Sequence, residues 1–194
     1  MKPLLYMDID GVLNPLRSRS KGRPEGWNAA YMDNSGDEPI VFPSKRFYRY
    51  KNHGHIIVWY PVDAREWFDA LKDVYDVCWA SKWGRSASTV YAGLFGMEGE
   101  IPFLDIPNIP EAQCPLSRYT GRHAKDCDCL HSKTLLLTDH ADGRPFVWVD
   151  DEATKRDVTW LTQNDPRGRA YIVDGYHGLR RGDVNSLVGM AQDL

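Results

Sequence analysis

Short apolar runs alternate along the chain with longer stretches in which apolar residues recur at helical spacing. Five runs are typical of buried strands, at residues 4–9, 74–80, 101–106, 146–149 and 170–173. Helical spacing predicts helices after a capping Asp63, over 86–95, from Ser132, over 153–161, and over 183–194 behind a capping Asp183. Strands that alternate with helices form parallel sheets with helices on both faces, so we expect one Rossmann-like α/β domain over residues 1–194.

The pattern loosens between about residue 15 and residue 60, where Gly, Pro, Ser and Asn are frequent. Two β-rich runs, at 46–50 and 55–60, flank the turn-like segment Lys51-Asn52-His53-Gly54. Such a pair predicts a β-hairpin. We therefore expect residues 16–60 to form a small, hairpin-containing, cap-like insert within the domain.

Polar residues follow three of the predicted strands. Asp8 and Asp10 lie at the end of the first, Ser81 follows the second, and Asp150 and Asp151 follow the run at 146–149. Open α/β sheets bind ligands at the carboxyl ends of their strands, so these side chains indicate a site at that edge. Each also has a structural interpretation, because Asp and Gly favour turns and an acidic pair can cap the following helix.

Together with Lys133, which lies at the start of the helix predicted from Ser132, these residues form four motifs. They occur in the order Asp8-Ile9-Asp10-Gly11, Ser81, Lys133 and Asp150-Asp151. This order resembles the haloacid dehalogenase-like (HAD) superfamily of phosphatases and phosphotransferases. The segment from Asp10 to Asn14 is also similar in spelling to small actinobacterial and phage HAD proteins and to HAD domains proposed for RNA repair. Lys125 is the alternative candidate for the motif lysine if the helix begins earlier than Ser132.

The resemblance implies a role for the residues of each motif. Asp8 would attack phosphorus and form an aspartyl-phosphate, while Asp10 would act as general acid and then as general base. Ser81 and Lys133 would bind the phosphoryl oxygens. Mg²⁺ would be held by four acidic residues, with Asp10 contributing its backbone carbonyl and Asp151 acting through water: Asp8, Asp10, Asp150 and Asp151.

The activity implied is Mg²⁺-dependent hydrolysis of a phosphomonoester. Two alternatives stay open: a phosphotransferase that passes the phosphoryl group to an acceptor other than water, and a non-catalytic binding protein that keeps the scaffold. The presence of all four motifs favours an enzyme, since a pure binding protein would have no chemical need of an acid/base carboxylate such as Asp10.

Composition narrows the choice of partner. The chain has 194 residues, 42% of them hydrophobic, and a formal net charge of −3, which excludes a disordered chain and a strongly basic nucleic-acid binder. Residues 16–55 nevertheless hold eight basic against four acidic residues, interleaved with aromatics such as Trp27 and Tyr48. Bases and aromatics together favour a nucleotide or a nucleic-acid end as the phosphorylated substrate, although a solvated loop explains them equally well.

Four cysteines are too few for a disulfide scaffold. Three of them lie near two histidines, a grouping that admits a structural zinc site or simply free thiols: Cys114, His123, Cys127, Cys129 and His131. No apolar run approaches the ~20 residues needed to cross a bilayer, and Asp8 and Asp10 interrupt any apolar core of a signal peptide. We expect a cytoplasmic protein without membrane contact, while the oligomeric state is not predicted.

Overall fold

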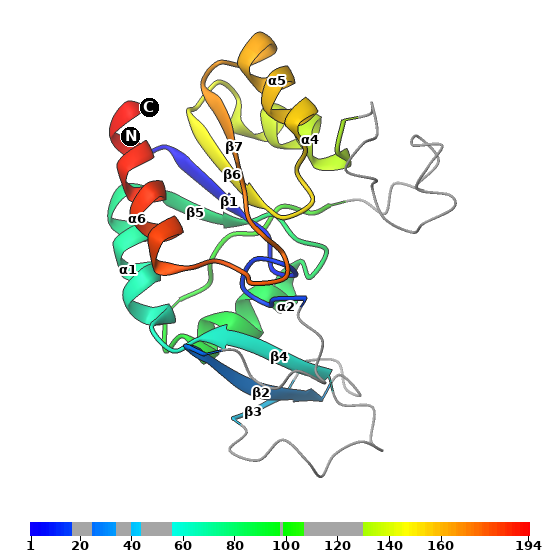
Figure 1. Cartoon of the computed structure of the whole chain (residues 1–194), viewed down its shortest axis with the longest axis vertical. Helices are drawn as coiled ribbons and strands as arrows, with labels where there is room; N and C mark the ends of the chain where they lie inside the picture. Colours follow the sequence, from blue (N-terminus) through cyan, green and yellow to red (C-terminus); the bar gives the residue numbers. More distant parts are fainter. Residues whose placement is uncertain (17–24, 34–39, 44–55, 98, 107–129) are drawn as a thin grey trace, which may run out of the picture.

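A four-stranded parallel sheet forms the centre of the molecule (Figure 1). The computed structural model describes residues 1–16, 25–33, 40–43, 56–97, 99–106 and 130–194. The strand order across the sheet is β5-β1-β6-β7. The strands span Leu4–Met7 (β1), Asp76–Trp79 (β5), Phe146–Asp150 (β6) and Gly168–Ile172 (β7).

Helices cover both faces of this sheet, as the sequence predicts (Figure 1). Alternate residues of β1 point to opposite faces: Leu5 and Met7 join one hydrophobic core, and Leu4 and Tyr6 join the other. Helices α1 and α6 close the first core, and α4 and α5 close the second. These helices span Ala64–Val74 (α1), Ser132–Ala141 (α4), Lys155–Asn164 (α5) and Arg181–Met190 (α6).

The connections place a switch point at the carboxyl end of β1. From β1 the chain passes through α1 to β5 on one side, and from β5 it passes through α4 to β6 on the other side. The two neighbours of β1 are therefore reached by crossovers on opposite faces of the sheet. Ligands of open α/β sheets bind where the strand order reverses in this way.

A second, antiparallel sheet lies within the region that the sequence assigns to an insert (Figure 1). Its order is β3-β2-β4, with strands at Trp27–Asp33 (β2), Ile40–Pro43 (β3) and Ile56–Pro61 (β4). Strand β4 coincides with one predicted run and pairs with β2, whereas the run at 46–50 lies outside the described residues. The sequence did not predict β2 or β3.

Three predicted elements differ in the structure. Residues 101–106 form no strand; only Phe103 bridges to Trp79, because Pro102 has no N–H to extend the ladder. Asp183 is the third residue of α6 rather than its cap, and its carboxylate accepts a hydrogen bond from Arg180 N at 2.8 Å. The helix expected over 86–95 begins as α2 and widens into a π-helix, and α6 ends in a 3₁₀ turn; these pieces span Arg85–Ala87, Ser88–Ala92 and Ala191–Asp193.

Over the described residues, no helix is both long enough and apolar enough to span a membrane.

Candidate active site

Asp8 lies at the carboxyl end of the central strand β1 and is almost fully buried. The backbone N–H of Ile9 donates to Asp8 Oδ1 at 2.8 Å, and the hydroxyl group of Ser81 donates to the same carboxylate. Ser81 follows β5, the strand next to β1. Two neighbouring strand ends therefore hold one carboxylate in a fixed orientation.

Lys133 brings a positive charge to this carboxylate from the first turn of α4. Its Nζ atom lies 2.9 Å from Asp8 Oδ2 and 2.7 Å from Asp150 Oδ2, and its side chain is 5% exposed. Asp150 ends strand β6, on the other side of β1, and is completely buried. The buried ammonium group therefore bridges carboxylates from two adjacent strands.

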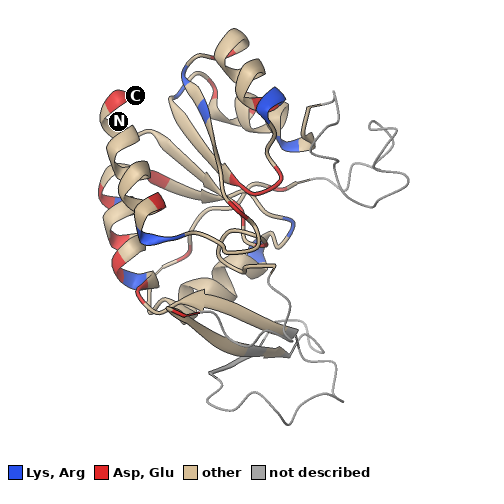
Figure 2. Ribbon diagram, in the orientation of Figure 1, with Lys and Arg blue, Asp and Glu red and all other residues tan. Residues whose placement is uncertain are grey.

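Three carboxylates gather at this point. Figure 2 shows acidic positions on the ribbon near the middle of the molecule, where β1 and β6 end. One carboxylate oxygen from each of Asp8, Asp150 and Asp151 lies within 4.8 Å of the others; we call these residues the acidic cluster. Oxygens bound to one small divalent cation at about 2.1 Å lie up to about 4.2 Å apart, so these three oxygens would have to move closer together to share such an ion. Carboxylate oxygens are donors suited to hard cations such as Mg²⁺ and Ca²⁺.

Two glycines make room for Asp151. A Cβ atom built on Gly11 would lie 2.1 Å from the Asp151 carboxylate carbon, and one on Gly175 would lie 2.2 Å from Asp151 Oδ2. Gly11 also has a φ of +76°, which other residues rarely adopt. The loops after β1 and β7 therefore approach the Asp151 side chain closely enough that any larger residue would displace it.

Burial and neighbouring charges shift the pKa values of the ionisable groups in the site. Burial and the charge of Asp150 raise the pKa of Asp8 to about 6, against the opposing effect of Lys133 and Ser81. Burial and the charges of Asp150, Glu152 and Asp8 raise the pKa of Asp151 to about 7. The pKa of Lys133 is raised because Asp150 and Asp8 outweigh its burial, so this lysine stays charged.

Asp10 lies apart from the acidic cluster. Its side chain is exposed, and it accepts hydrogen bonds from Asn14 Nδ2 at 2.7 Å and from Trp83 Nε1 at 2.9 Å. The sequence analysis assigned the backbone carbonyl of Asp10 to the metal and its side chain to acid/base chemistry. The structure directs that side chain to Asn14 and Trp83.

The start of α4 is fixed by a buried carboxylate on α5. Asp157 is completely buried and accepts from His131 N at 2.8 Å and from Thr134 Oγ1 at 2.6 Å. It also accepts from both the backbone and the hydroxyl of Thr154, which caps α5. His131 in turn caps α4, its Nδ1 accepting from Lys133 N at 3.1 Å. Asp157 therefore holds the residues on either side of Lys133.

The structure brings together most of the residues that the sequence singled out: Asp8, Ser81, Lys133, Asp150 and Asp151. Lys125 lies outside the described residues, as do all the predicted zinc ligands except His131, whose ring caps α4 and packs on Trp148 at 5.4 Å.

Four residues around the site were missed by the sequence reasoning: Asn14, Trp83, Trp148 and Asp157. Trp148 Nε1 donates to Asp150 Oδ2 at 3.0 Å, and its position two residues before Asp150 on one strand could have shown that they share a face. The pattern Thr154-x-x-Asp157 could have indicated a capping box. Asn14 ends the segment whose spelling supports the resemblance, but that spelling gave it no role, and no local pattern points to Trp83.

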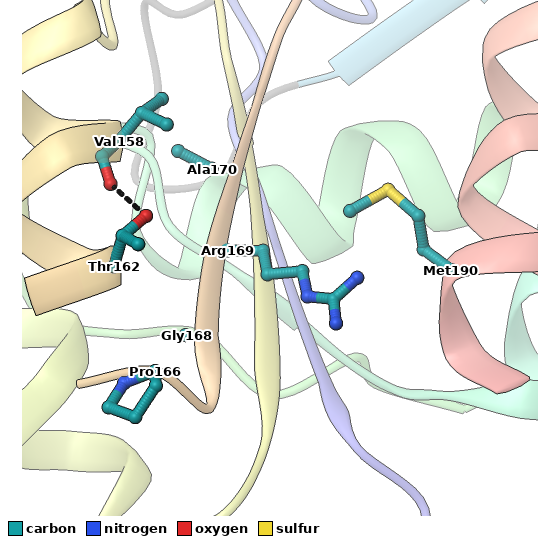
Figure 3. A pocket seen from close by; sticks show the side chains of 7 residues that line it. All are labelled: Val158, Thr162, Pro166, Gly168, Arg169, Ala170 and Met190. Carbon is teal, nitrogen blue, oxygen red and sulfur yellow. Dashed lines mark hydrogen bonds between the residues drawn. The ribbon is translucent and has the colours of Figure 1, made fainter. Parts of the chain in front are cut away.

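A separate cavity of ≈ 360 Å³ lies beside β7, the edge strand of the large sheet (Figure 3). Figure 3 shows Val158 and Thr162 of α5 on one side and Met190 of α6 on the other. Arg169 is the charged residue among those that line it, and this guanidinium donates to Asp193 O at 3.0 Å. No residue of the acidic cluster lines this cavity, so we place the candidate site at Asp8.

A comparison of the chain with models of known protein families gives no match, and a search among curated proteins gives none either. The functional argument therefore rests on the geometry and charges of the site.

Proposed function

We propose that this protein is a magnesium-dependent phosphomonoester hydrolase of the HAD type, acting through an aspartyl-phosphate on Asp8. One observation carries the proposal: Asp8 ends the central strand, with the ammonium group of Lys133 at 2.9 Å and with carboxylates of Asp150 and Asp151 close enough to share a cation. Carboxylates alone would repel a phosphate, whereas Lys133 places a positive charge beside the nucleophile and a cation held by the acidic cluster would add to it.

Mg²⁺ fits the donor set of the acidic cluster, which would hold it through Asp8, Asp150 and Asp151. When bound there, the ion would neutralise phosphate charge and hold the phosphoryl group in line with the nucleophile.

The chain's own groups would divide the remaining work. Asp8 attacks phosphorus through a carboxylate oxygen, and the bond from phosphorus to the ester oxygen breaks. Asp10, exposed and able to exchange protons with water, donates a proton to the departing ester oxygen. It then takes a proton from the water that attacks the aspartyl-phosphate, which releases phosphate and restores Asp8. Lys133 and the hydroxyl of Ser81 stabilise the charge on the phosphoryl oxygens.

The test is phosphate release by the purified protein with Mg²⁺, wild type beside Asp8→Asn. The panel holds an aryl phosphate, mononucleotides, and DNA and RNA with terminal phosphates. Asp73→Asn, an exposed residue of α1, is the matched control. We expect turnover in the wild type and the control and none in Asp8→Asn. Full activity in Asp8→Asn would remove Asp8 from the nucleophile role.

The intermediate itself can be trapped. Borohydride reduces an acyl phosphate to an alcohol, so quenching during turnover should convert Asp8 to homoserine, as read by peptide mass spectrometry. Wild-type protein that binds Mg²⁺ but releases no phosphate from any substrate would argue for a phosphotransferase or a binding protein. The trap separates these two, because only the phosphotransferase forms the acyl phosphate.

A nucleotide or a nucleic-acid end is the proposed substrate class, on the strength of the basic and aromatic residues at 16–55. Arg46→Gln with Arg49→Gln should raise KM for an end-phosphorylated oligonucleotide and flatten its salt dependence by roughly 0.7 per lost phosphate contact. KM for a small aryl phosphate should not change. The matched control is Lys72→Gln with Lys155→Gln, on exposed helical positions.

A further inference from the structure

The exposed carboxylate of Asp10 is held by two directed hydrogen bonds, one to each oxygen. Asn14 Nδ2 donates to Oδ1 at 2.7 Å, and Trp83 Nε1 donates to Oδ2 at 2.9 Å. An exposed aspartate without such partners samples several rotamers, and its carboxylate rotates freely. The two donors come from different segments, the loop after β1 and the loop after β5, so together they fix both the position and the plane of the carboxylate.

Each donor is itself held in place. The half-buried indole of Trp83 packs edge-on against Tyr91, with ring centroids 5.6 Å apart and an interplanar angle of 70°. Tyr91 is completely buried and packs in turn on Phe95. This aromatic contact directs the indole N–H outward from the core to Asp10.

Asn14 is held from the other side by the small antiparallel sheet. Its Oδ1 accepts a hydrogen bond from the backbone N–H of Trp59 in β4 at 3.0 Å. The side chain at position 14 must therefore donate a hydrogen bond to Asp10 and accept one from Trp59 N. The amide group of asparagine has both a donor and an acceptor. Asn14 therefore links the proposed acid/base carboxylate to the β2–β3–β4 sheet.

We propose that Asn14 and Trp83 are positioning residues for proton transfer by Asp10, and that Asn14 couples this carboxylate to the β2–β3–β4 sheet. The inference rests on the proposed function, in which the Asp10 proton passes to the ester oxygen as the bond from phosphorus to that oxygen breaks. It adds that the proton is delivered from a fixed direction, because a misplaced acid transfers its proton slowly.

Leaving-group dependence distinguishes this role from a structural one. An activated aryl phosphate leaves as a stable phenolate and needs no proton, whereas an alkyl phosphate leaves as an alcohol and needs one. Trp83→Phe keeps the ring on Tyr91 and removes only the N–H. Departure of the leaving group is reported by kcat/KM, which does not include the later hydrolysis of the aspartyl-phosphate that both substrates share. We expect Trp83→Phe to lower kcat/KM for the alkyl phosphate about 10-fold to 100-fold and kcat/KM for the aryl phosphate by less than about threefold.

Asn14→Ala and Asn14→Asp test the second donor. Asn14→Asp keeps the acceptor for Trp59 N but faces Asp10 with a carboxylate, so we expect the same selective loss on the alkyl phosphate. In Asn14→Ala the amide of Trp59 should also exchange its hydrogen faster than in the wild type. Trp160→Phe, which removes a half-buried indole N–H on α5, is the matched control and should leave both substrates unchanged.

Equal losses of kcat/KM on both substrates, or no loss on either, in Trp83→Phe would overturn the inference while the wild type remained an active phosphatase. Unchanged exchange at Trp59 in Asn14→Ala would overturn the coupling to the insert sheet. Absence of phosphate release by the wild type from both substrates would instead defeat the proposed function. Should an Asn14 variant fail to fold, Trp83→Phe still decides the positioning role.

Discussion

The ammonium group of Lys133 lies 2.7 Å from the carboxylate of Asp150, and both side chains are buried. The lysine comes from the start of α4 and the aspartate from the end of β6. A buried ion pair costs much of its Coulomb energy in lost hydration, so its presence is weak evidence for stability. Because Lys133 also contacts Asp8, the pair is better understood as fixing a charge beside the proposed nucleophile.

Replacing Lys133 tests this interpretation. Lys133→Met leaves the carboxylates of Asp8 and Asp150 buried without their cation, so we expect the metal-free protein to lose about 3–5 kcal/mol of unfolding free energy. We also expect kcat to fall about 10²-fold to 10³-fold, since the charge no longer faces the phosphoryl oxygens. Urea denaturation and phosphate release measure the two effects. Lys155→Met, on an exposed position of α5, should change neither, and a fully active Lys133→Met would exclude the proposed role.

Close approach of the loop after β7 to Asp151 gives a second prediction. Gly175→Ala would place a Cβ 2.2 Å from Asp151 Oδ2, so the carboxylate must move, and we expect Mg²⁺ affinity to fall about 10-fold to 100-fold. Calorimetric titration with Mg²⁺ measures it. The matched control is Gly189→Ala in α6, where the Cβ meets nothing within 4 Å and should stabilise the helix by up to about 1 kcal/mol.

A double variant shows whether the loss passes through Asp151. Asp151→Ala removes the group with which the Gly175→Ala methyl collides. If displacement of this carboxylate is the cause, Gly175→Ala should weaken Mg²⁺ binding much less in the Asp151→Ala background than in the wild type. Additive losses would instead indicate that the loop itself had changed conformation.

The large sheet and its site could be predicted because their signals are local. Asp8 and Asp150 lie at the ends of apolar runs that predict strands, and the carboxyl ends of parallel strands lie along one edge of the sheet. Strand β2 gave no such signal, because Trp27–Asp33 contains no β-branched residue and forms a strand through its pairing with β3 and β4.

The groups that hold the site in place could not be predicted, because they depend on contacts between distant segments. Asp157 reaches His131 N across 26 residues, and Asn14 reaches Trp59 N across 45. A local pattern identifies Asp157 as part of a capping box, but it does not reveal that the same carboxylate serves a second helix. Such convergence depends on the crossing of α4 and α5, which the hydrophobic pattern alone does not specify.

The raised pKa of Asp151 predicts how stability depends on pH in the absence of metal. A carboxyl group whose folded pKa is about 7 binds its proton more tightly in the native state, so its contribution is present at low pH and is lost as pH rises from about 4 through 7. Asp151→Asn cannot ionise. After allowance for its partial exposure, we expect this variant in EDTA to have a Tm about 2–4 °C above the wild type at pH 7.5.

The difference should shrink toward pH 5, where the wild-type carboxyl group is protonated. Mg²⁺ at pH 7.5 should raise the Tm of the wild type more than that of Asp151→Asn, because the variant lacks one of the three carboxylates. Scanning calorimetry across this pH range measures both effects, with the exposed Asp139→Asn as the matched control. A constant difference between Asp151→Asn and the wild type at all pH values would contradict the assignment of the pH dependence to Asp151.

Asp157 gives the last prediction, because it satisfies four donors at the adjoining ends of α4 and α5. Asp157→Asn replaces one acceptor oxygen with an NH₂ group that faces hydrogen-bond donors, and we expect a loss of about 2–4 kcal/mol in unfolding free energy. Since His131 and Thr134 flank Lys133, kcat should also fall at temperatures where the variant is fully folded. Asn164→Ala, at the exposed end of α5, should cost less than about 0.5 kcal/mol. A destabilised Asp157→Asn with unchanged kcat would show that Lys133 is positioned without this carboxylate.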